Sequence, residues 1–65
     1  MTIGALLEEA HRVENEAGYH LTGAVVQRRV TRATLERIAR EFRRAADLLE
    51  QAAALLPDRT QRGSQ

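Results

Sequence analysis

The sequence predicts an all-α fold, a helical hairpin with a short first helix, a short middle element and a long C-terminal helix. In two separate stretches the apolar residues recur at alternating spacings of three and four, which is the period of one face of an α-helix. The single proline, Pro57, follows the second stretch. We therefore expect one helical domain over residues 1–57 and a flexible polar tail over 58–65.

The first helix is expected over residues 3–17. Its start is indicated by Thr2, because threonine is a favoured N-cap residue. Its end is expected at Gly18, because glycine commonly follows the last turn of a helix. The apolar residues with helical spacing in this stretch are Ile3, Leu6, Ala10, Val13 and Ala17.

The second helix is expected over residues 32–56 and has the clearest pattern in the chain. Thr31 or Thr34 can cap its start, and Pro57 fits its end because the residue before a proline is disfavoured in the helical conformation. Its apolar residues keep the alternating spacing over three heptads: Leu35, Ile38, Phe42, Ala45, Leu49, Ala52 and Leu56.

The middle stretch, residues 18–31, does not continue the pattern of the second helix. Extending that helix backwards would place Arg28 and Thr31 on its apolar face and would turn Val26 and Val30 away from it. We expect a turn followed by a short separate element. A short helix is favoured, although the β-branched valines also suit a strand.

The small size of the chain predicts self-association. A domain of 65 residues has a marginal core, and the absence of cysteine removes disulfides as a source of stability. Because the second helix is expected to be longer than the first, part of its apolar stripe stays uncovered in a hairpin, and a homodimer resembling a four-helix bundle would cover it. The residues predicted to form the core or oligomer interface are Leu6, Val13, Leu35, Ile38, Phe42, Leu49 and Leu56.

The sequence shows no pattern typical of catalysis, and we expect no enzyme activity, cofactor or metal. Glu8 and His11 have the carboxylate-histidine spacing of di-iron helix bundles, but they fall on the outer face of the predicted helix and have no counterpart in the second helix. The longest apolar run, residues 52–56, is too short to span a membrane, and the first residues lack the pattern of a signal peptide. We expect a cytoplasmic protein that does not bind membranes.

The charges are unevenly distributed, with four glutamates and one arginine in residues 1–20 and seven arginines and two glutamates in residues 21–46. All ten basic residues are arginine, which together with the abundant alanine indicates a GC-rich genome, such as that of a bacterium or phage. We expect a small non-catalytic helical protein-interaction module, an adaptor, inhibitor or assembly subunit that binds itself and another protein. The alternative is a nucleic-acid-associated regulator that uses the arginines of residues 28–44. The candidate partner-binding residues are Tyr19, His20, Val26, Arg28, Arg29 and Arg32.

Overall fold

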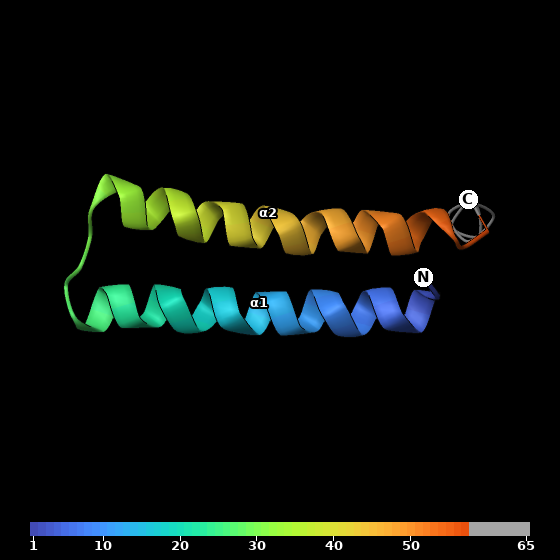
Figure 1. The fold of residues 1–65 in the computed structure, drawn as a ribbon, viewed down its shortest axis with the longest axis horizontal. Helices are drawn as coiled ribbons and strands as arrows, with labels where there is room; N and C mark the ends of the chain where they lie inside the picture. Colours follow the sequence, from blue (N-terminus) through green and yellow to red (C-terminus); the bar gives the residue numbers. More distant parts are fainter. Residues whose placement is uncertain (58–65) are drawn as a thin grey trace, which may run out of the picture.

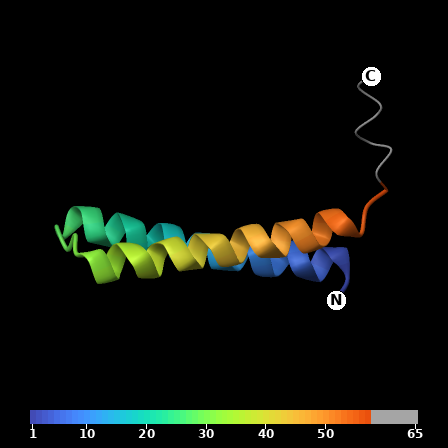
Figure 2. The same ribbon diagram turned by 90° about the horizontal axis from the view of Figure 1, so that it is seen from above.

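The computed structural model describes residues 1–57 and shows two helices packed side by side. Helix α1 comprises Ile3–Val26 and helix α2 comprises Arg32–Ala54, and the two run antiparallel on either side of a short turn (Figure 1). Turned by 90°, the helices cross at a shallow angle, and the end of α2 lies near the start of α1 (Figure 2). The predicted all-α helical hairpin is confirmed. The predicted tail, 58–65, lies outside the described residues.

Threonine side chains cap the start of both helices. The Thr2 hydroxyl accepts a hydrogen bond from the Ala5 amide at 3.1 Å, and the Thr31 hydroxyl accepts one from the Thr34 amide at 3.2 Å. Each cap satisfies an amide that has no partner inside the helix, which typically stabilises a helix by about 1 kcal/mol. Of the two caps considered for the second helix, Thr31 is the one that forms. The last residue of α2 is Ala54, two residues before the predicted end at 56.

The prediction that the first helix ends at residue 17 is wrong. Helix α1 continues through Gly18 and Gly23 to Val26, so residues 18–26 form no separate element and no strand. The three-and-four spacing in fact persists beyond Ala17, because Ala24 lies seven residues further on and is also buried. His20 stands between them in the same stripe, where it interrupts the apolar pattern.

The chain leaves α1 through a backbone conformation that normally favours glycine. Arg28 has a φ of 58°, in the left-handed region. Its amide donates to the Val25 carbonyl at 3.3 Å, and the Arg29 amide donates to the Ala24 carbonyl at 2.8 Å. These two bonds form a Schellman motif, which ends the helix and satisfies two of its last carbonyls. The turn to α2 therefore occupies only residues 27–31.

The core lies along the line where the two helices meet and consists largely of small residues. Leu6, Ala10 and Val13 from α1 pack with Ala45, Leu48 and Ala52 from α2. Leu48 is only 2% exposed, although the sequence pattern did not select it. Among the predicted core or interface residues, Leu6, Val13 and Ile38 are buried, whereas Leu35, Phe42, Leu49 and Leu56 are exposed in the single chain.

The prediction that unequal helix lengths leave part of the apolar stripe uncovered is wrong. The helices have 24 and 23 residues and match along their length. The exposed leucines are uncovered because they lie on a different side of α2 from the core. Within residues 1–57, neither helix is long and apolar enough to cross a bilayer.

Candidate interaction surfaces

Helix α2 carries two parallel stripes, and the more apolar of the two does not face α1. The stripe that faces α1 is largely apolar but also contains the polar residues Thr34 and Glu41. In the second stripe each residue directly follows a residue of the first, so it lies about 100° further around the helix. This exposed stripe contains no polar residue: it consists of Leu35, Ala39, Phe42, Ala46, Leu49, Ala53 and Leu56.

Helix α1 has a matching stripe on the same side of the hairpin. Its members directly follow the core residues of α1 and are partly polar: Leu7, His11, Glu14, Gly18, Leu21 and Val25. Between the two stripes runs an open groove of about 420 Å³, to which α1 contributes Leu7, His11 and Glu14 and α2 contributes Phe42 and Leu49. We call this side of the hairpin, made by both stripes, the apolar face. His11 therefore lies beside the groove and not on the outer face where the sequence pattern placed it.

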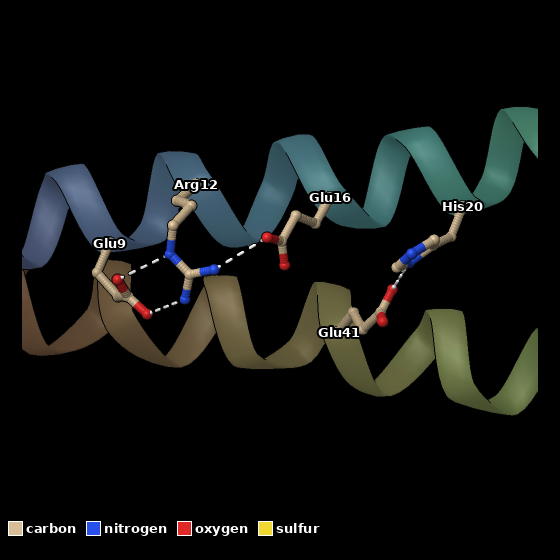
Figure 3. A network of polar contacts seen from close by, with 5 residues as sticks. All are labelled: Glu9, Arg12, Glu16, His20 and Glu41. Carbon is tan, nitrogen blue, oxygen red and sulfur yellow. Dashed lines mark hydrogen bonds and ion pairs between the residues drawn. The ribbon is translucent and has the colours of Figure 1, made fainter.

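Polar contacts lie along the opposite side of α1 and between the two helices (Figure 3). On α1, the Arg12 guanidinium bridges Glu9 and Glu16, and its contact with Glu16 measures 3.0 Å. Between the helices, Nδ1 of His20 lies 2.9 Å from Oε1 of Glu41, so the ring nitrogen donates to the carboxylate. The second carboxylate oxygen of Glu41 lies 3.6 Å from Nε of Arg37.

The contact between His20 and Glu41 changes the acidity of the carboxyl group. The hydrogen bond from His20 lowers the pKa of Glu41, and the charges of His20 and Arg37 lower it further, against a smaller opposing effect of burial. On α1, the hydrogen bond from Arg12 lowers the pKa of Glu9 in the same way. Both carboxylates therefore stay ionised at neutral pH.

A second cavity lies at the turn end of the hairpin, away from the apolar groove. It measures about 460 Å³, and its rim includes Tyr19, His20, Val26 and Arg29, four of the six candidate partner-binding residues. Ala24 and Ile38 contribute apolar surface to it. Tyr19 is 79% exposed, and its ring meets that of His20 edge-on, with 6.0 Å between centroids. The turn thus combines an exposed aromatic ring, an apolar surface and a cation.

The other two candidate partner-binding residues, Arg28 and Arg32, do not line this cavity. Arg32 pairs with Glu36 at 3.7 Å and does not line it. Arg28 lies in the turn, where it is the one described residue with a left-handed backbone. Five arginines make none of the ion pairs found in the part of the chain that the structure describes: Arg28, Arg29, Arg40, Arg43 and Arg44.

Sequence reasoning missed Glu41 as a member of these surfaces. Glu41 is the charged residue in the core stripe of α2, and His20 is its counterpart in α1. The sequence did not predict that His20 and Glu41 pair, because the pairing requires α1 to extend beyond Gly18. Among the described residues, no group of three or more potential ligand side chains could hold a metal ion.

Comparison with known protein families, curated protein sequences and solved structures finds no match for this chain.

Proposed function

We propose that this chain is a non-catalytic helical protein-interaction module that self-associates through its apolar face and binds a partner protein at its turn end. The observation that carries the proposal is the exposed stripe of α2, where Leu35, Leu49 and Leu56 are each at least 45% exposed. Monomeric proteins seldom expose a continuous apolar surface of this kind, and such surfaces usually mark interaction sites.

The weakness of the internal core supports the same proposal. The main core cluster contains only three residues larger than alanine, namely Leu6, Val13 and Leu48. Burying one such side chain contributes about 1.5–3 kcal/mol, whereas ordering the backbone costs about 1–2 kcal/mol for every residue. Covering the apolar face would bury Phe42 and the four leucines of the stripes that the hairpin leaves most exposed: Leu7, Leu35, Leu49 and Leu56.

The test compares substitutions on the apolar face, in the turn and in the internal core. Leu49→Asp places a charge on the apolar face, so we expect the protein to lose its dimer mass in light scattering. Val30→Asp alters an apolar residue in the turn that is more exposed than Leu49, and should keep that mass. Leu48→Ala opens a cavity in the internal core and should lower the free energy of unfolding by about 2–5 kcal/mol.

Two results would contradict self-association through this face. The first is a wild-type protein that is folded and monomeric at high concentration. The second is a Leu49→Asp protein that keeps the wild-type mass, because a buried unpaired carboxylate would cost several kcal/mol at an interface.

The turn end is the proposed partner site because it joins Tyr19 to unpaired arginines. Tyrosine and arginine are the residue types that most often dominate binding energy at interfaces. Replacing both Arg28 and Arg29 by glutamate should abolish partner binding while α1 and α2 stay helical in circular dichroism. Retained binding by this double variant, measured beside Arg40→Glu as a control outside the turn and outside the apolar face, would contradict the assignment.

The unpaired arginines also favour one alternative, a nucleic-acid-associated regulator. Contacts with phosphates would give an affinity that falls steeply with salt, because each neutralised phosphate releases counterions. A titration with duplex and single-stranded DNA at two salt concentrations distinguishes the two functions. An absence of binding at low salt excludes the alternative.

A further inference from the structure

We infer that a second copy of this chain covers the apolar face, with α2 packed antiparallel on α2 about Ala46 and α1 packed on α1. The inference rests on the proposed self-association and adds its geometry. It identifies which residues meet across the interface and therefore predicts a register.

The exposed stripe of α2 has the size pattern that close packing of two identical helices needs. Ala39, Ala46 and Ala53 recur at seven-residue intervals and alternate with larger side chains. Small residues let helix axes approach to the lower end of the usual 8–10 Å range. The larger members lie in pairs on either side of Ala46, so a two-fold axis beside Ala46 brings Phe42 of each copy next to Leu49 of the other.

Charges beside the stripe are complementary in this register. Arg43 and Glu50 directly follow Phe42 and Leu49 and are exposed, so they border the stripe on the side away from α1. About a two-fold axis at Ala46, Arg43 of each copy lies beside Glu50 of the other. Arg43 forms none of the ion pairs within the described residues and is available for this contact.

The polar residues of α1 fit the same axis. His11 and Glu14 line the groove together with Ala45 and Ala46, so they lie at the same height along the hairpin as the proposed axis. An axis at this height passes between the levels of His11 and Glu14. It therefore places His11 of each copy opposite Glu14 of the other, and both polar side chains gain a partner where α1 meets α1.

Two other arrangements of a second copy leave charges unmatched. If the two α2 helices packed parallel, Arg43 would meet Arg43 and Glu50 would meet Glu50. If α1 packed on α2 of the other copy, Glu14 would be covered by the apolar stripe around Phe42, without a cation. The antiparallel arrangement is the one that pairs all four of these charged or polar positions.

Single cysteines test the register, because the chain has no cysteine of its own. A residue on the two-fold axis meets its own copy, so Ala46→Cys should form a disulfide-linked dimer under mild oxidation. Ala39→Cys alone and Ala53→Cys alone should not cross-link efficiently, whereas a mixture of the two should give the mixed dimer. Gln51→Cys, exposed on the same helix but outside the stripe, controls for random collision.

The outcomes separate this geometry from self-association itself. Efficient self-cross-linking of Ala39→Cys would show a parallel seam and overturn the inference. A protein that is dimeric by light scattering, but in which Ala46→Cys cross-links no better than Gln51→Cys, would also overturn it and leave the proposed function standing. A wild-type monomer would overturn both.

A charge exchange provides a second, independent test. Arg43→Glu alone and Glu50→Arg alone should each weaken dimerisation by about tenfold, because two contacts in the dimer become repulsive. The double variant, Arg43→Glu with Glu50→Arg, restores both contacts and should recover an affinity close to that of the wild type. Additive weakening in the double variant would contradict the predicted register.

Discussion

At the scale of single residues, one polar pair holds the helices together where the apolar pattern breaks. His20 and Glu41 each replace an apolar residue in the stripe that faces the other helix, and about a third or less of each side chain is exposed. Because the pKa of Glu41 is lowered in the folded state, its contribution to stability is fully present above the unfolded pKa near 4.5 and is lost as the pH falls through the folded pKa.

We therefore predict that Glu41→Gln flattens the acid side of the stability profile. Glutamine keeps the size of the side chain and an acceptor oxygen for His20. It does not ionise, so it lacks the stability that the wild-type carboxyl group gains when it loses its proton. In urea unfolding, the variant should be less stable than the wild type by up to about 1 kcal/mol at neutral pH. This difference should shrink as the pH falls below about 4.5.

The matched control for this prediction is Glu8→Gln. Glu8 is an exposed carboxylate on α1 without a hydrogen bond or ion pair among the described residues, so its replacement should leave the profile close to that of the wild type. A difference between wild type and Glu41→Gln that stays constant from neutral to acidic pH would show that the pair contributes through packing alone.

At the scale of the helices, the sequence pattern predicted that α1 ends at residue 17, whereas it ends at Val26. Gly18 suggested a helix end but sits inside α1, and the left-handed position at the true end holds Arg28. Sequence patterns predicted Thr2 as the N-cap of α1, left Thr31 and Thr34 as alternatives for α2, and gave the extent of α2 to within two residues. They could not predict the end of α1, because its last turn is held by backbone hydrogen bonds, and because the pairing of His20 with a residue 21 positions away leaves no local signal.

Replacing a glycine inside α1 by alanine should raise the free energy of unfolding. A Cβ added at Gly18 or at Gly23 meets nothing within 4 Å in the hairpin. Alanine should therefore stabilise the folded protein by about 0.5–1 kcal/mol at either position, mainly by restricting the unfolded chain. Chemical unfolding measures this gain. A loss at Gly18 with a gain at Gly23 would indicate that Gly18, on the apolar face, contacts another chain closely.

At the scale of the whole molecule, the unbroken heptad pattern of α2 predicts residues that share one face, and that face is not the one that packs on α1. The heptad spacing of Leu35, Phe42, Leu49 and Leu56 is unbroken and predicts either a core or an oligomer interface. The internal contact instead uses the adjacent stripe, whose pattern Thr34 and Glu41 interrupt. Periodicity shows which residues share a face. It does not show whether that face meets the same chain or another one, and here the better apolar stripe is the exposed one.

This division of the apolar surface predicts that folding and association are coupled. If the dimer supplies much of the apolar burial, unfolding releases two chains, and its free energy rises by about 1.4 kcal/mol for each tenfold increase in concentration. With an unfolding entropy near 2.1 cal/mol/K per residue for two copies of residues 1–57, Tm should rise by about 6 °C per tenfold increase. Calorimetry over a hundredfold concentration range measures this slope, with Leu49→Asp as the control that should show none. A wild-type Tm independent of concentration would mean that the hairpin is stable alone and that the apolar face contributes nothing to its folding.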